Sequence, residues 1–330
     1  MNTVPLDNSS DKFIAKALSW LEKNYDAITY LNPNQYSKYP QKPFRHLIAF
    51  GSEHYVQVDT SQNVFDCWET IRNQYSKDWL FAFVSYEGKN SVENISSKKE
   101  QAIAFSTATF NIPQHVWEIT SNEVRILKGA GTSIIADIHS YTIEENEQQE
   151  CIAINHLVSK THYIKQATAI QKYIREGNAY EINYCIPFIG NGKLHVINTY
   201  FKLNALTPMP FSVFYKFNSE YILSASPERF IKKEQTTIIS QPIKGTSKRG
   251  ATAEQDQELK NTLRHSQKEQ SENTMIVDLV RNDLSRTAVA GSVHVPELSG
   301  MYTFPNVHQL ISTIASTIDT AYSSIEVVKH

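Results

Sequence analysis

Residues 221–240 read YILSASPERFIKKEQTTIIS, and this stretch indicates the fold class. Two runs rich in β-branched and aromatic residues, 221–225 and 236–240, flank the polar segment 232–235, which predicts a β-hairpin. The rest of the chain contains neither a regular alternation of strands and helices nor a glycine-rich phosphate loop. We therefore expect an α+β fold with substantial antiparallel sheet rather than a doubly wound parallel sheet.

The regions on either side of this hairpin mix helices and strands. Apolar residues recur every three or four positions between Tyr163 and Ile174, and Gly177 follows as a stop, which predicts an amphipathic helix. A second helix is expected near residues 13–21, and residues 261–286 are expected to be largely helical. Short apolar or aromatic runs predict strands at residues 79–86, 99–110, 116–127, 179–186 and 210–215.

The polar run at residues 144–150 predicts a boundary between two regions. The first region, 1–145, is expected to be rich in strands, and the second, 146–330, carries the residues with chemical interest. Because 41% of the residues are hydrophobic and 20% are charged, the composition is that of a compact globular protein.

Composition and charge also exclude several kinds of partner. The 330 residues carry 32 Lys+Arg against 34 Asp+Glu, so nucleic acid is not an expected partner. The first ten residues do not resemble a signal sequence, and no stretch reaches the ~20 apolar residues of a membrane helix, so we expect a cytoplasmic protein without membrane association. The cysteines are far apart and are expected to be reduced: Cys67, Cys151 and Cys185.

Three ionisable residues stand out by their context: Glu228, Lys244 and Glu272. From residue chemistry alone, Glu228 is most simply a surface ion pair and Lys244 a solvated lysine. A carboxyl with a raised pKa can instead act as a general acid, and a lysine becomes a nucleophile where its pKa is lowered. A hairpin symmetric about Glu234 would place Lys244 opposite Ser224, with Glu228 roughly 13 Å along the strand from that point.

Glu272 shares a helix face with Ile276 and Leu279, so its carboxylate is expected to point toward the core. A salt bridge to an arginine or a bound Mg²⁺ would each satisfy an inward carboxylate. By residue type, His308 is expected to be a buried structural histidine. An ion-pair network is expected further along the helix, at Asp278, Arg281, Asn282 and Asp283.

Five motifs follow one another in order along the chain: GNAYEIN at 177–183, SPERF at 226–230, PIKGT at 242–246, SENTMIVDLVRNDL at 271–284 and VHQLIS at 307–312. Together they resemble the chorismate-binding enzymes, the family that contains anthranilate synthase component I, aminodeoxychorismate synthase component I and the isochorismate and salicylate synthases. The resemblance implies large antiparallel sheets packed together and flanked by helices. Within the family, the sequence resembles the aminodeoxychorismate synthase branch, because that branch has a lysine at the position of Lys244, where anthranilate synthases usually carry a small residue.

The resemblance implies a role for each candidate residue. Glu228 corresponds to the acid that helps the C4 hydroxyl of chorismate to leave, and Glu272 to one of two glutamates that bind Mg²⁺. By the same resemblance Lys244 adds at C2, and ammonia from a glutamine amidotransferase subunit then attacks C4 and expels the lysine. The product would be 4-amino-4-deoxychorismate, for p-aminobenzoate and folate biosynthesis. The expected substrate contacts are Glu181, Gly245, Thr246 and His308.

The sequence departs from the family pattern in two ways. Glu181 stands where the aminating branches usually have glutamine and the isochorismate and salicylate branches have lysine, which argues against water as the nucleophile. The sequence also stops before the family's carboxylate-binding arginine and second metal-binding glutamate. We therefore expect this chain to be incomplete, inactive by itself, and to expose apolar surface.

Two other functions stay open from the sequence. One is anthranilate synthase component I, which belongs to the same family. The other is a non-catalytic module that binds chorismate or a partner protein.

Overall fold

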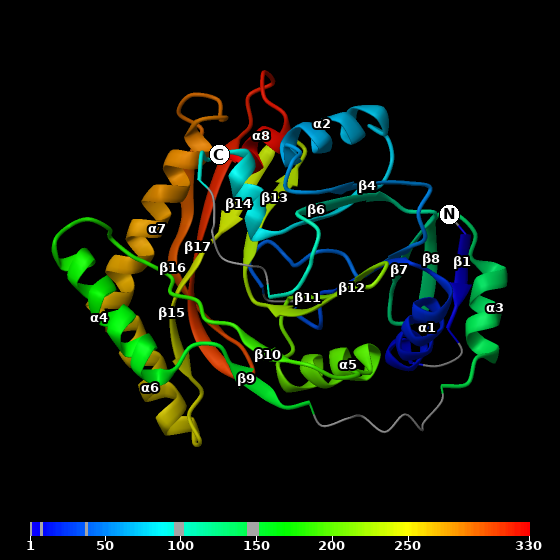
Figure 1. The fold of residues 1–330 in the computed structure, drawn as a ribbon, viewed down its shortest axis with the longest axis horizontal. Helices are drawn as coiled ribbons and strands as arrows, with labels where there is room; N and C mark the ends of the chain where they lie inside the picture. Colours follow the sequence, from blue (N-terminus) through cyan, green and yellow to red (C-terminus); the bar gives the residue numbers. More distant parts are fainter. Residues whose placement is uncertain (1, 7–8, 37–38, 96–101, 144–151) are drawn as a thin grey trace. The chain divides into compact units, whose positions relative to one another are not determined.

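The computed structural model describes residues 2–6, 9–36, 39–95, 102–143 and 152–330 (Figure 1). The chain folds into two compact units of unequal size. The larger unit contains residues 1–97, 105–143 and 196–330, and the smaller one residues 98–104 and 144–195.

A seven-stranded antiparallel sheet runs through the larger unit. Its strands lie in the spatial order β1 (Asn2–Pro5), β8 (Glu123–Lys128), β7 (His115–Ile119), β3 (Leu47–Phe50), β2 (Ala27–Asn32), β11 (Phe211–Phe217) and β12 (Glu220–Ser226). Because β11 pairs with β2 on one side and with β12 on the other, it joins the N-terminal strands to the second half of the chain.

Three helices share one hydrophobic core with this sheet: α1 (Ser10–Asn24), α3 (Thr132–Ser140) and α5 (Val196–Leu206). Leu18 of α1, Ile138 of α3 and Tyr200 of α5 are completely buried in it. Burial of side chains of this size contributes roughly 1.5–3 kcal/mol each to the stability of the fold.

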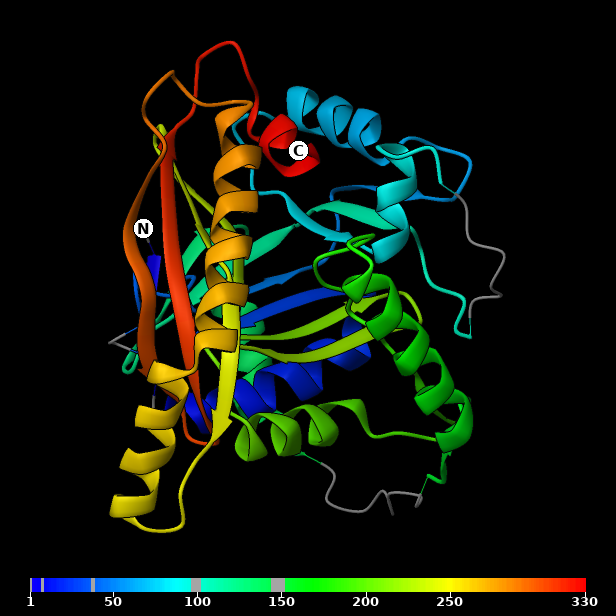
Figure 2. The ribbon, with the colours of Figure 1, turned by 90° about the vertical axis from the view of Figure 1, so that its left-hand side faces the viewer.

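A second antiparallel sheet is built around β17 (Val307–Thr317), in which only the two end residues are not buried. Different parts of one β17 edge pair with β14 (Thr237–Gln241) and β15 (Ile243–Lys248), and its other edge pairs with β16 (His294–Thr303). The strand β13 (Arg229–Glu234) adds to β14. Figure 2 shows α7 (Gln267–Ser285) running along this sheet, with α6 (Ala253–His265) before it.

A third, three-stranded sheet has the order β4 (His54–Val58), β6 (Ala108–Ile112) and β5 (Phe81–Val84). It packs against α2 (Val64–Gln74) and α8 (Ser324–Lys329), and a 3-10 helix, Tyr86–Ser91, follows β5. Ile325 of α8 is buried in the same core as Phe65 and Phe110, so the last helix is part of this layer.

The smaller unit contains α4 (Lys160–Arg175) and a short antiparallel pair, β9 (Ile154–His156) and β10 (Phe188–Gly190). Gly177 follows α4 with a φ of 76°, in the left-handed region that glycine adopts without a Cβ clash. The segment between α4 and β10 is irregular.

Several sequence expectations are confirmed. The fold is α+β with antiparallel sheets flanked by helices, residues 13–21 lie in α1, the helix before Gly177 is α4, and residues 211–215 lie in β11. Residues 116–127 form two strands, β7 and β8, instead of one.

Other expectations are wrong. Strand β12 pairs with β11 and not with residues 236–240, and residues 232–234 belong to β13, so the turn lies at Gln235 and Thr236. Residues 179–186 form no strand, and the helical region 261–286 is two helices separated at Ser266. The strands expected at 79–86 and 99–110 are shorter, Phe81–Val84 and Ala108–Ile112.

The cysteines and the expected boundary are only partly visible in the structure. Cys67 and Cys185 are free thiols, while Cys151 and the polar run 144–150 lie outside the described residues. Among the described residues, no helix is long and apolar enough to cross a membrane. Large apolar side chains are exposed at several positions, including Tyr86, Tyr180 and Phe230.

Candidate active site

A β-bulge in β15 carries two of the candidate residues, Lys244 and Gly245. Ile243 pairs with Ile311 of β17, but the next pair is Thr246 with Gln309, so Lys244 and Gly245 together face one residue of β17, Leu310. A bulge of this kind bends a strand and redirects a side chain, and bulges are frequent next to active sites.

The bulge requires a glycine at position 245. Gly245 has a φ of 91°, and a Cβ added there would lie 3.0 Å from Leu310 Cδ1 and 3.2 Å from the Glu269 side chain. Both the backbone conformation and the close approach of α7 therefore exclude a larger residue without strain. Of the expected substrate contacts, Gly245 is part of this bulge and Thr246 follows it directly.

Glu228 lies against the same strand. Its Oε1 accepts a hydrogen bond from the backbone N–H of Ile243 at 2.9 Å. Surrounding protein atoms raise the pKa of Glu228 above its ordinary value, whereas the Ile243 N–H and the positive charge of Lys244 lower it. Although the residue is partly exposed, its pKa is raised on balance, as a general acid requires.

The carboxylate of Glu228 therefore lies beside the residue that precedes Lys244, and Lys244 is near enough to lower its pKa, which replaces the arrangement estimated from an ideal hairpin. Pro242 interrupts the chain between β14 and β15, and β15 then pairs with β17 rather than continuing the hairpin. The carboxylate of Glu228 consequently contacts the backbone one residue before Lys244.

A cavity of ≈ 1060 Å³ reaches the Glu228 side of this site. Its lining includes Glu228, Arg229, Phe211 and Phe230 together with residues of β5, α7 and α8. It is large enough for a small organic ligand, and its walls are mainly apolar. Lys244 does not line it.

Glu272 does not point into the core as expected. The buried residues of α7 are Asn273, Val277 and Leu284, and Leu279 on the expected inward face is 55% exposed. The side chain of Glu272 is one-third exposed and forms an ion pair with Lys268, four residues earlier, at 3.2 Å. Glu272 therefore does form a salt bridge, but the expected arginine partner is wrong, because the carboxylate pairs with a lysine of its own helix.

The Lys268 ammonium also lies 3.4 Å from Glu269 Oε1, so one cation is held between two carboxylates of α7. This arrangement shows that Glu269 and Glu272 can approach a shared positive charge. Among the described residues, no group of three or more His, Cys, Asp or Glu side chains is arranged for a metal ion.

The ion-pair network expected after Glu272 is confirmed in part. Asp278 pairs with Arg281 at 2.8 Å, and Arg286 donates to the Asn282 side-chain oxygen at 3.5 Å. Burial raises the pKa of Asp283, and the positive charge of Arg286 opposes that rise.

His308 is buried, with 1% of its surface exposed, and both ring nitrogens have partners. Nε2 lies 3.0 Å from Asp256 Oδ1, and Nδ1 lies 2.9 Å from the Thr303 hydroxyl. This confirms the expectation of a buried structural histidine, and the substrate contact that the resemblance implies stays a prediction. Thr246 is exposed on the same sheet, and its hydroxyl accepts from the Gln309 amide at 3.3 Å.

Two residues of this region were not anticipated from the sequence, Arg249 and Asp256. Arg249 follows β15 directly, and Asp256 lies in the first turn of α6, where an N-cap at Thr252 marks the helix start. The sequence does carry a signal for the helix start, because Thr252 is a favourable N-cap and Glu254 and Asp256 are acidic residues in the first turn.

Glu181 belongs to the smaller unit, in the irregular segment between α4 and β10. Its expected role as a substrate contact stays a prediction.

The sheets and flanking helices have the same fold as two synthases of known structure. Anthranilate synthase component I from Streptococcus pneumoniae TIGR4 matches with a TM-score of 0.71 at 17% identity, over 90% of this chain and 74% of that chain. The menaquinone-specific isochorismate synthase from Escherichia coli matches with a TM-score of 0.69 at 14% identity, over 100% of this chain and 73% of that chain. At these identities the match shows the fold.

The model of the chorismate binding enzyme family matches residues 22–330, so this chain belongs to that family. Aminodeoxychorismate synthase component 1 of Klebsiella aerogenes is 40% identical over 161 residues, 49% of this chain and 36% of that protein. Anthranilate synthase component 1 of Saccharolobus solfataricus is 27% identical over 259 residues, 76% of this chain and 59% of that protein. The probable aminodeoxychorismate synthase of Oryza sativa subsp. japonica is 36% identical over 197 residues, 58% of this chain and 22% of that protein. The chain thus spans less than two-thirds of the length of these relatives.

Proposed function

We propose that this protein aminates chorismate at C4 to give 4-amino-4-deoxychorismate, with ammonia supplied by a glutamine amidotransferase subunit. The observation that carries the proposal is the neighbourhood of Glu228 and Lys244 across the start of β15. Relatives at 36–40% identity are named aminodeoxychorismate synthases, which supports the same branch.

In the proposed reaction, Lys244 is the nucleophile and Glu228 the general acid. The neutral Lys244 amine forms a bond to C2 of chorismate, the ring double bonds shift, and the C4–O bond breaks. Glu228 donates its proton to the departing oxygen, which leaves as water. Ammonia then forms a bond to C4 and Lys244 is expelled from C2, so one difficult substitution is divided into two easier ones.

The local electrostatics support these roles. A raised pKa keeps a larger fraction of Glu228 protonated, which favours proton donation. Once Glu228 has lost its proton, the Ile243 N–H stabilises the carboxylate through the 2.9 Å hydrogen bond. While protonated, Lys244 lowers the pKa of Glu228 and is not a nucleophile, so in the proposed reaction it must lose its proton before the attack on C2.

Mg²⁺ is part of the proposal, with Glu272 as its ligand and Glu269 as a neighbouring carboxylate. The ion would neutralise a chorismate carboxylate and orient the ring. Lys268 now contacts both carboxylates, so it would have to move away for either to bind the ion.

The test is product identification with the purified protein, chorismate, ammonium and Mg²⁺, followed by chromatography and mass spectrometry. Formation of 4-amino-4-deoxychorismate supports the proposal. Anthranilate as the product would overturn the C4 assignment, and binding without turnover would favour a non-catalytic module.

Anthranilate synthase component I is the second candidate. It is favoured by the 27% identity over 76% of this chain, which is a longer match than those to the aminodeoxychorismate synthases. The same product analysis separates the two.

A further inference from the structure

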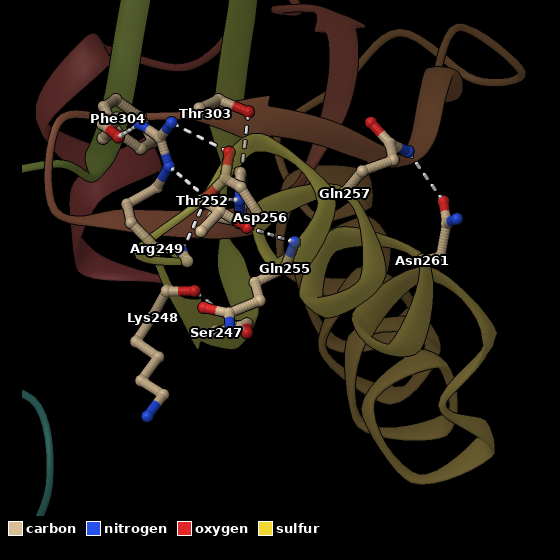
Figure 3. Close-up of polar contacts among 12 residues, drawn as sticks. Ser247, Lys248, Arg249, Thr252, Gln255, Asp256, Gln257, Asn261, Thr303 and Phe304 are labelled. Atoms are coloured by element: carbon tan, nitrogen blue, oxygen red, sulfur yellow. Dashed lines mark hydrogen bonds and ion pairs between the residues drawn. The ribbon is translucent and has the colours of Figure 1, made fainter.

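The Asp256 carboxylate is the centre of a polar cluster at the end of β15 (Figure 3). Its Oδ1 accepts from Arg249 Nε at 2.7 Å, from the Gly250 backbone N–H at 2.8 Å and from His308 Nε2 at 3.0 Å. Its Oδ2 accepts from Arg249 Nη2 at 2.8 Å, which completes a two-point pairing with the guanidinium. Arg249 and the Gly250 N–H hold the pKa of Asp256 well below its usual range, so the carboxylate is ionised.

This cluster joins three separate parts of the chain. Asp256 belongs to α6, Arg249 follows β15, and His308 lies near the start of β17. Arg249 also donates from Nη1 to the Phe304 carbonyl at 2.9 Å, in the turn between β16 and β17. Gly250 permits the close approach, because a Cβ there would lie 2.2 Å from the Asp256 backbone nitrogen.

The cluster fixes the ring of His308. A carboxylate can only accept a hydrogen bond, so Nε2 carries a proton and donates it to Asp256. Nδ1 lies 2.9 Å from the Thr303 hydroxyl, on the strand at the other side of β17. With both nitrogens engaged and the ring buried, the side chain has one orientation.

The backbone of His308 lies opposite β15 in the sheet. It is paired with Ser247 of β15, and the adjacent pair is Thr246 with Gln309. These pairs lie immediately after the bulge. On the other side of the bulge, Ile243 is paired with Ile311 and donates its N–H to Glu228. Lys244 and Gly245 are therefore held between two anchored points.

We propose that Asp256 is a positioning residue that acts through His308 and the register of β15 to fix where the bulge presents Lys244. The role of Lys244 rests on the proposed function, but the anchoring of β15 does not. The Asp256 carboxylate binds Arg249, Gly250 and His308, so its effect on the reaction is indirect.

The test compares Asp256→Asn with Glu258→Gln in the full chain. Glu258 is an exposed residue of the same helix, so its substitution removes one negative charge without touching the cluster. For Asp256→Asn we expect kcat to fall about 10- to 100-fold, as displacement of a reacting group does, with KM for chorismate within about threefold of the original. Glu258→Gln is expected to leave both constants unchanged.

Two measurements do not depend on turnover. Ring ¹⁵N shifts of His308 report which nitrogen carries the proton, and Asp256→Asn is expected to shift them toward a mixture of the two tautomers. Amide hydrogen exchange at Thr246 and Ser247 is expected to rise at least tenfold in Asp256→Asn and to stay unchanged in Glu258→Gln.

A double variant shows whether the effect passes through His308. If it does, Asp256→Asn adds little to the loss already caused by His308→Gln. Additive losses would overturn the route through His308, and unchanged exchange at β15 would overturn the anchoring. If Asp256→Asn does not fold, Thr303→Val breaks only the second His308 hydrogen bond and takes its place. Formation of anthranilate instead of 4-amino-4-deoxychorismate would refute the proposed function, while the exchange and ¹⁵N data would still decide the anchoring.

Discussion

The carboxylate of Glu228 accepts the backbone N–H of Ile243 at 2.9 Å, immediately before Lys244 in the chain. This hydrogen bond connects the segment before β13 to the start of β15, fifteen residues later. It also stabilises the ionised form of Glu228, in opposition to the surrounding protein atoms that raise its pKa. The pKa of the Glu228 carboxyl thus depends on its hydrogen bond to the strand that carries the proposed nucleophile.

Glu228→Gln tests the general acid. The amide oxygen can still accept the Ile243 N–H, so the local fold should be kept, but the group can no longer donate an acidic proton. We expect kcat to fall by roughly 10²–10⁴. Because the acid must be protonated, activity of the original protein should decline as pH rises through the raised pKa of Glu228, and this decline should be missing from the residual activity of the variant. A variant with normal kcat would remove Glu228 from the reaction.

Lys244→Ala tests covalent catalysis. Without the amine no bond to C2 can form, so amination at C4 should fall to the background rate. Mass spectrometry of the original protein incubated with chorismate and Mg²⁺ in the absence of ammonia should show an adduct on the peptide that contains Lys244. The matched control is Lys248→Ala, an exposed lysine at the end of the same strand, which should keep both the adduct and the rate. Near-normal amination by Lys244→Ala would contradict the covalent route.

The fold class could be predicted from the sequence, but the strand partners could not. The turn at Gln235 has a φ of 53°, a conformation for which glycine or asparagine is the usual signal, so nothing in the sequence marked it. Asn218 carries the expected signal, with a φ of 52° between β11 and β12, and it would have identified their pairing. The sequence therefore marks the turn between β11 and β12 with Asn218 but carries no such mark at Gln235.

The candidate site shows the same limit. Motifs identified Glu228 and Lys244, but their proximity depends on the long-range pairing of β15 with β17, which no local pattern contains. The sequence predicts an inward face of α7 with Ile276 and Leu279, but the buried residues are Asn273 and Val277. The predicted face is therefore rotated by about one residue. A helix packed between a sheet and solvent has partly apolar residues on its flanks, and periodicity alone does not fix the rotation of the helix that closely.

Gly245→Ala tests the bulge. The substitution forces a non-glycine residue to a φ of 91° and places a Cβ 3.0 Å from Leu310, so strain and crowding add. We expect a loss of about 2–4 kcal/mol in the free energy of unfolding, measured by urea denaturation. The control is Gly291→Ala, because Gly291 has a φ of 77° but open space around the added Cβ. It should lose only the backbone contribution, about 1–2 kcal/mol. Equal losses would show that the contact with Leu310 and Glu269 is unimportant.

We expect the stability of the larger unit to fall in acid because of His46. Burial lowers the pKa of His46 from 6.5 to about 4, and its Nε2 lies 2.8 Å from the Tyr30 hydroxyl. The unfolded chain therefore binds the proton more readily than the folded one, so stability falls as pH decreases from 6.5 toward 4. The loss is at most about 3 kcal/mol. In His46→Gln, which can keep a hydrogen bond to Tyr30, urea denaturation across this range should show a flatter pH dependence. An unchanged slope would assign the acid sensitivity to other groups.

Substitutions of Lys268 and Glu272 are expected to change the affinity for Mg²⁺ in opposite directions. The Lys268 ammonium lies 3.2 Å from Glu272 and 3.4 Å from Glu269, so it competes with any cation that these carboxylates bind. Removing the Lys268 charge, which has the same sign as the metal ion, should improve the free energy of Mg²⁺ binding at this solvated site by about 1 kcal/mol. That corresponds to roughly fivefold in affinity. Lys268→Met should therefore lower the Mg²⁺ concentration that gives half-maximal activity by about that factor, and Glu272→Gln should raise it.

Asp278→Asn is the control for this pair, since Asp278 lies on the same helix, is largely exposed and forms its ion pair with Arg281. It removes the same charge as Glu272→Gln without affecting Lys268. Calorimetric titration of Mg²⁺ in the presence of chorismate gives a second measurement that does not require turnover. If Lys268→Met and Glu272→Gln shift Mg²⁺ affinity no more than Asp278→Asn does, Glu272 is a partner of Lys268 alone, and the ion must be bound elsewhere.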